Sequence, residues 1–220
     1  MNRVSFLTVA TCLVAAAPAL AAPSSGTVGG SVKIEGAPVQ NLVVYIERVA
    51  LPPTSAFLKA AIPATVEQRN TQFSPGSLVV VAGQTVQFPN LDKFYHNVFS
   101  RSPGNEFDLG LYRAGASKTM HLDQPGEVDV YCNIHPDMTA RILVLQNSLY
   151  TAVNGDGSFR LADVPPGHYT LVAWSPAHTP ERRTIDVKAG EVVRADFALK
   201  LRSESKAHLN KSGEQYGRYH

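Results

Sequence analysis

Residues 128–145 read VDVYCNIHPDMTARILVL, and this stretch determines what the middle of the chain forms. Up to Tyr131 β-branched residues alternate with polar ones, and strand-like sequence resumes from Thr139 to Leu145. Both halves are typical of β-strands. The seven residues from Cys132 to Met138 are therefore expected to form a short loop between two strands.

Similar short β-branched runs occur on both sides of this stretch, at 43–46, 78–81 and 85–88. Turn residues separate them and helical periodicity is scarce, which predicts an all-β fold built from sandwiches. We expect strands over 27–49, a block of strands over 66–147, and a further block over 148–200. The polar, aperiodic residues 201–220 are predicted to be a disordered tail.

The N-terminus has the order of a secretory signal peptide: Arg3, an apolar run from Val4 to Ala17, and then small residues. We predict that residues 1–21 are removed and that the mature protein is periplasmic or secreted. Cys12 leaves with this segment, so Cys132 has no internal disulfide partner and is a reactive thiol or a ligand.

The charge is nearly balanced, with 20 basic and 18 acidic residues, and the remaining chain has no long apolar run. These features predict neither nucleic-acid binding nor a membrane span in the mature form.

The loop residues Cys132, His135 and Met138 bring together a thiolate, an imidazole and a thioether. Each residue alone has an ordinary interpretation, as a buried thiol, a surface histidine or a core methionine. Together, soft sulfur ligands and imidazole select copper over hard cations, and two His, one Cys and a weak axial Met define a type 1 copper site. The second histidine must come from elsewhere. His96, which leads into strand-like residues 97–100, is the best candidate.

This block resembles the cupredoxin family, and the Cys-x2-His-x2-Met loop is similar to the short ligand loop of amicyanins. The run FPNLDKFYHN at 88–97 resembles the strand that carries the first ligand. The resemblance covers about residues 72 to 146 and implies a Greek-key cupredoxin β-sandwich over 66–147 with one type 1 copper.

The resemblance also implies how the copper site is built. Copper would be held by His96, Cys132, His135 and Met138, with His96 as the more buried imidazole, His135 as the edge-exposed one and Met138 as the weak axial ligand. Asn97 would stiffen the site by hydrogen bonding across the loops, and Pro136 is the second residue expected to support the ligands.

Residues 150–172 resemble a second family, the carboxypeptidase-regulatory-like (transthyretin-like) β-sandwich domains. The strand pair that opens such domains occurs far upstream, at 29–45. The resemblance therefore implies one discontinuous sandwich over 27–49 and 148–200, with the cupredoxin domain inserted. Trp174 and Tyr169 are expected to fill its core.

The cupredoxin resemblance implies a periplasmic blue copper protein that carries single electrons and is not an enzyme. Its expected partners are redox proteins such as a periplasmic dehydrogenase or a c-type cytochrome, with Ile134 and Pro136 forming an apolar docking surface beside His135. The sequence lacks the His-x-His pairs of multicopper oxidases and the second nearby Cys of dinuclear copper centres. A copper-trafficking or copper-sensing protein, or an adhesion-type sandwich with a vestigial site, remains an alternative.

Overall fold

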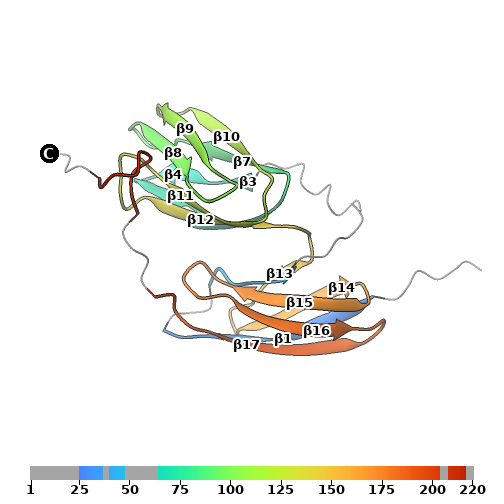
Figure 1. The fold of residues 1–220 in the computed structure, drawn as a ribbon. Coiled ribbons are helices and arrows are strands. Elements are labelled where there is room, and N and C mark those ends of the chain that lie inside the picture. Colours follow the sequence, from blue (N-terminus) through green and yellow to red (C-terminus); the bar gives the residue numbers. More distant parts are fainter. Residues whose placement is uncertain (1–24, 37–39, 48–63, 204–207, 217–220) are drawn as a thin grey trace, which may run out of the picture.

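The computed structural model describes residues 25–36, 40–47, 64–203 and 208–216, so the expected signal peptide at 1–21 lies outside the described residues. The described ranges contain seventeen strands and no helix, which confirms the all-β prediction. The strands form two units (Figure 1), which we call the central sandwich (residues 64–145) and the split sandwich (26–47 with 150–199). No helix in these ranges has the length and apolar character needed to cross a bilayer.

The central sandwich contains a five-stranded sheet of order β6-β12-β11-β8-β9, a three-stranded sheet of order β10-β7-β3 and the hairpin β4–β5. Its strands are β3 (Ala64–Thr65), β4 (Glu67–Arg69), β5 (Gln72–Ser74), β6 (Ser77–Val81), β7 (Gln84–Pro89), β8 (His96–Ser100), β9 (Phe107–Tyr112), β10 (Ser117–Leu122), β11 (Gly126–Tyr131) and β12 (Thr139–Leu145).

The core of the central sandwich lies between its two larger sheets. In β11, Val128 and Val130 are fully buried while their neighbours are more accessible, as the two-residue period of a strand requires. They pack in one cluster with Phe88 of β7. Cys132 and Met138 belong to the same buried cluster, so both ends of the predicted ligand loop are anchored in the core.

The split sandwich consists of a sheet of order β14-β1-β17 and a sheet of order β13-β2-β15-β16. Its strands are β1 (Gly26–Ile34), β2 (Val43–Glu47), β13 (Tyr150–Ala152), β14 (Ser158–Val164), β15 (Gly167–Trp174), β16 (Glu181–Val187) and β17 (Val192–Leu199). β1 and β2 precede the central sandwich in the sequence but pair with strands that follow it.

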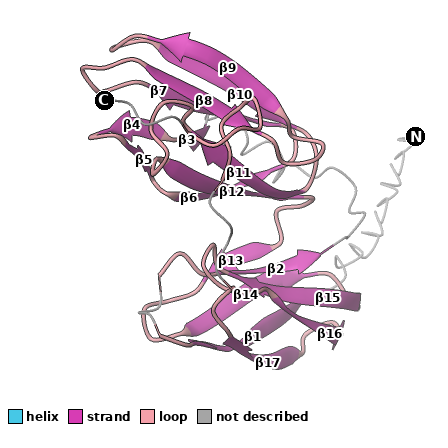
Figure 2. Cartoon of the chain, turned by 60° about the vertical axis from the view of Figure 1, so that its left-hand side comes forward, coloured by secondary structure: helices cyan, strands magenta, loops and turns pink. Residues whose placement is uncertain are grey.

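The two sandwiches meet at β12, which is buried on both faces. Ile142 and Val144 pack into the core of the central sandwich, whereas Leu143 and Leu145 point the other way and pack with Trp174. Figure 2 shows β12 on the side of the central sandwich that faces β2 and β13.

Trp174 was expected in the core of the split sandwich, and here the structure differs. In β15, Leu171 and Ala173 point into that core, and Tyr169 packs against it from the same face. Trp174 is one residue out of step with them, so the strand period places its ring on the opposite face, at the contact between the sandwiches.

Within the tail at 201–220, for which composition predicts disorder, the structure describes residues 201–203 and 208–216, and these make contacts with both sandwiches. Arg202 donates to Oε1 of Glu127 at 2.7 Å and to the carbonyl of His178 at 2.7 Å. Residues 208–216 form turns that contact the central sandwich. These contacts join residues far apart in the sequence, and composition carries no signal of them.

The pairing of β1 can be tested at Gly30, which lies between Phe159 of β14 and Ala195 of β17. A Cβ atom at Gly30 would lie 1.8 Å from the carbonyl oxygen of Ala195. We expect Gly30→Ala to lower the free energy of unfolding by about 3 kcal/mol because the strands must move apart. Urea unfolding would measure this change.

Gly155→Ala is the matched control, because a Cβ atom at Gly155 meets nothing within 4 Å. Its free energy of unfolding should change by no more than about 0.5 kcal/mol. Equal stability of the two variants would contradict the position of β1 between β14 and β17.

Candidate metal centre

Three of the four predicted ligands meet at one end of the central sandwich. His96 is the first residue of β8, and Cys132 and His135 lie on the loop between β11 and β12. The Sγ atom of Cys132 is 3.8 Å from Nδ1 of His96 and 3.6 Å from Nδ1 of His135, and the two Nδ1 atoms are 3.2 Å apart. Within the described ranges this is the one group of three or more His, Cys or acidic residues with metal-binding geometry.

The spacing of these three atoms fits a single metal ion. A point equally distant from them lies about 2 Å from each atom, close to the bond lengths of about 2.0–2.3 Å that zinc makes with imidazole and thiolate. A donor set of two imidazoles and one thiolate selects copper among the common protein metals when a weak axial ligand completes it.

The environment of Cys132 favours the thiolate that a metal requires. Burial alone would raise the pKa of the thiol, but a hydrogen bond from His96 and the backbone N–H groups of Asn97, Ile134 and His135 outweigh it. The pKa of Cys132 is therefore held below its ordinary value. The sulfur accepts these contacts while fully buried, so its position is defined before any metal binds.

His96 is oriented by Asp92, a residue that sequence analysis missed. Nε2 of His96 is 2.8 Å from Oδ2 of Asp92, which leaves Nδ1 facing Cys132. Asp92 in turn accepts the backbone N–H groups of Asn70 at 2.6 Å and Thr71 at 2.9 Å, in the turn between β4 and β5. A carboxylate behind a histidine ligand fixes the tautomer and orientation of the ring.

The pKa of His96 reflects these contacts. Burial would lower it, but the neighbouring Cys132 and Asp92 raise it overall. The raised pKa means that a proton on His96 competes with a metal ion for the ring nitrogen that faces Cys132. An Asp four residues before the expected histidine ligand was the available sequence signal for this pair.

His135 and Met138 complete the loop. His135 is half-buried, and its burial together with nearby His96 lowers its pKa, which favours the neutral ring that can bind a metal. The backbone N–H of Met138 donates to the carbonyl of His135, and its own carbonyl accepts the N–H of Cys132. Met138 is fully buried in the cluster that contains Cys132, and axial ligation by its thioether stays a prediction.

Asn97 and Pro136 were expected to support the ligands, and neither side chain hydrogen-bonds to the ligand loop. The Asn97 side chain donates to Oδ1 of Asp108 at 2.6 Å, not to the ligand loop, and its buried Oδ1 has no partner among the described residues. Its backbone N–H is the group that reaches Cys132. Pro136 is exposed, and its carbonyl accepts a hydrogen bond from His208 at 2.5 Å.

Asp92→Asn tests the support of His96. The substitution removes the negative charge behind the ring and replaces one acceptor oxygen with a donor facing the turn of β4–β5. We expect Cu(II) affinity, measured by competition with a chelator of known affinity, to fall by about tenfold or more. Asp123→Asn is the matched control, because Asp123 is an exposed partner of the exposed His121. An unchanged affinity in Asp92→Asn would contradict this account of the site.

Comparisons with known protein families match two parts of the chain. Residues 60–145 match the family of copper binding proteins, plastocyanin/azurin family, and residues 137–200 match the carboxypeptidase regulatory-like domain. No curated protein matches the chain.

Several solved structures are similar to part of the chain. A novel purple cupredoxin from Nitrosopumilus maritimus is 22% identical, with 37% of this chain and 98% of that chain covered and a TM-score of 0.34. A Cu-containing nitrite reductase from Thermus scotoductus SA-01 is 26% identical, with 46% and 24% covered and a TM-score of 0.38. A Cu(I) amicyanin mutant is 19% identical, with 46% and 97% covered and a TM-score of 0.36. By the two family matches, one part of the chain is similar to copper-binding proteins of the plastocyanin/azurin family and the next part to the carboxypeptidase regulatory-like domain.

Proposed function

We propose that this protein is an exported blue copper protein that carries single electrons between redox partners and catalyses no reaction itself. The observation that carries the proposal is the triangle of His96, Cys132 and His135, whose ligand atoms already surround one point at bonding distance. The ligands would be these three residues, with Met138 as the weak axial fourth.

Copper bound there would supply a one-electron couple between Cu(II) and Cu(I). What the chain contributes is a frame that holds the ligands in place. His96 is fixed by Asp92, the Cys132 sulfur by backbone N–H groups, and the loop by hydrogen bonds between its own ends. Ligands that move little between oxidation states allow fast electron transfer, because little reorganisation accompanies each step.

The surface near the site suits transient contact with a partner. Four of the large exposed apolar side chains in the described residues lie on the loop before His96 or on its partner strand β9: Leu91, Phe94, Tyr95 and Leu111. Exposed apolar patches of this kind mark interaction sites. Together with half-buried His135 they support docking of a redox protein such as a periplasmic dehydrogenase or a c-type cytochrome.

Export is part of the same proposal. The signal-peptide pattern at 1–21 supports a periplasmic or secreted location, and Cys132 is then the sole cysteine of the mature chain. Within the described residues Cys132 is free and buried. A buried thiol among two imidazoles is protected from disulfide exchange and available to a metal.

The Cu(II)-loaded protein should show an intense visible band from charge transfer between the Cys132 thiolate and copper. The band should disappear on addition of a reductant, return on reoxidation, and be absent in Cys132→Ser. Visible absorption and paramagnetic resonance spectra measure this directly. A colourless protein with weak tetragonal copper signals would contradict electron carriage and favour the trafficking or sensing alternative.

Met138→Leu tests the axial ligand. Leucine fills a similar volume but offers no lone pair, so the variant should keep the thiolate band while Cu(II) loses a donor. We expect the reduction potential to rise by about 60 mV, which corresponds to about a tenfold change in the relative stability of the two oxidation states. Met120→Leu is the control, because Met120 lies on β10 outside the ligand loop. An unchanged potential in Met138→Leu would remove Met138 from the ligand set.

A further inference from the structure

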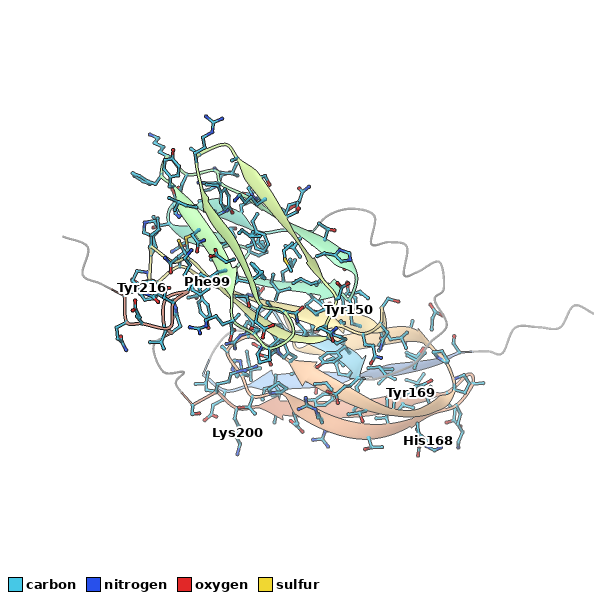
Figure 3. The ribbon with its side chains drawn as sticks, turned by 45° about the horizontal axis from the view of Figure 1, so that its top comes forward. Phe99, Tyr150, His168, Tyr169, Lys200 and Tyr216 are labelled. Atoms are coloured by element: carbon cyan, nitrogen blue, oxygen red, sulfur yellow. The ribbon has the colours of Figure 1, made fainter. Side chains whose placement is uncertain are left out.

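Residues 208–216, which we call the C-terminal strap, lie against the ligand loop of the central sandwich although they follow the last strand of the split sandwich. Figure 1 shows this segment in dark red beside the end of the central sandwich. In Figure 3 the label of Tyr216 marks the strap, and Lys200 marks the end of the split sandwich from which the chain arrives.

Three hydrogen bonds join the strap to three residues of the ligand loop. The Tyr216 hydroxyl donates to the carbonyl of Cys132 at 2.8 Å. The backbone N–H of Lys211 donates to Oδ1 of Asn133 at 2.9 Å. Nε2 of His208 donates to the carbonyl of Pro136 at 2.5 Å. The strap therefore contacts the loop on both sides of His135.

Aromatic rings add to these hydrogen bonds. The His208 ring is stacked on Tyr131, the residue before Cys132, with centroids 4.1 Å apart and planes 20° apart. The same ring makes an edge-to-face contact with Tyr216, with centroids 5.2 Å apart. Tyr131 also packs against Phe99 of β8. The strap thus packs on β11, which leads into the ligand loop, and Tyr131 links it to β8, the strand that begins at His96.

The strap also reaches the segment that carries His96. Nζ of Lys211 pairs with Oδ2 of Asp108 at 2.8 Å, and Oδ1 of Asp108 accepts the side chain of Asn97, the neighbour of His96. Burial would raise the pKa of Asp108, but these hydrogen bonds lower it overall, so the carboxylate is charged opposite the lysine. This network links the strap to the strand that supplies the first ligand.

The strap has a defined shape of its own. Oδ1 of Asn210 accepts the N–H groups of Ser212 and Glu214, and its carbonyl accepts the N–H of Gly213. Gly213 has φ of 83°, a conformation that glycine adopts without strain. A turn that is closed by its own hydrogen bonds loses less conformational entropy when it docks.

The chain is also anchored before it reaches the ligand loop. Arg202 bridges the two sandwiches, because it donates to Glu127 of β11 and to the carbonyl of His178 in the split sandwich. Arg202 lies between β17 and the strap in the sequence. Its hydrogen bonds therefore hold the chain against both sandwiches just before the strap begins.

We propose that the C-terminal strap is a positioning element of the copper site and that its docking and copper binding stabilise each other. The split sandwich then serves to present the strap to the ligand loop. The inference rests on the copper site proposed above. Because such coupling is reciprocal, whatever factor the strap adds to copper affinity, copper adds to the docking of the strap.

Two variants and one control test this proposal in the mature-length protein. The first ends the chain after Ser203 and removes the strap. The second, Tyr216→Phe, removes only the hydroxyl that donates to Cys132. The control, Tyr150→Phe, makes the same change on β13 of the split sandwich. Each is measured for Cu(II) affinity by chelator competition and for amide hydrogen exchange of residues 133–135, 137 and 138 in the metal-free state.

Removal of the strap should weaken Cu(II) binding by about tenfold and speed exchange of the loop amides by a similar factor. Tyr216→Phe should change both in the same direction by about fivefold, and Tyr150→Phe should change neither. Exchange in the metal-free protein tests whether the strap docks on the ligand loop, even if the intact chain shows no thiolate band, and the change in Cu(II) affinity tests the coupling of docking to copper binding. Equal loop exchange and equal affinity in the shortened and intact chains would overturn the proposal.

Discussion

The copper site depends on the pairing of β8 with β11. His96 and Cys132 are 36 residues apart in the sequence, and they meet because their strands are neighbours in one sheet, with Tyr131 opposite Phe99 and Val130 opposite Ser100. This register places the start of β8 and the end of β11 at the same edge. A one-residue slip would turn side chains to the other face and separate the imidazole from the thiolate. Cooperative formation of the sheet is therefore also the formation of the metal site.

A second constraint is that β12, the strand leaving the ligand loop, has no free face. One face contributes Ile142 and Val144 to the core behind the site, and the other contributes Leu143 and Leu145 to the contact with Trp174. The ligand loop thus connects β11 and β12, two strands that are packed in the core. Because β12 also packs on Trp174, the position of the loop depends on the split sandwich as well as on the central one. The strap adds a second connection between the same two units, at the ligand loop itself. The position of the ligand loop therefore depends on two contacts besides its own sheet. These are the interface between the sandwiches and the hydrogen bonds of the strap.

Features that depend on residues close together in the sequence could be predicted from the sequence. The run from Cys132 to Met138 between two strand-like segments predicted the short loop that the structure has, and strand periodicity predicted the all-β fold. The features that sequence analysis missed all join distant parts of the chain. Asp92 acts through a turn at Asn70 and Thr71, the side chain of Asn97 pairs with Asp108, and the strap reaches the loop from beyond the split sandwich. Composition predicts disorder over 201–220 because that segment contains few apolar residues, while the contacts of residues 208–216 are hydrogen bonds and ring stacking.

The central claim is that Cys132, His96 and His135 bind one copper ion together. X-ray absorption at the copper edge of the loaded protein tests it most directly, because it counts the sulfur and nitrogen atoms bonded to the metal. We predict one short bond to sulfur and two to imidazole nitrogen, with the sulfur lost in Cys132→Ser. A spectrum with nitrogen and oxygen neighbours alone, unchanged by that substitution, would contradict the account.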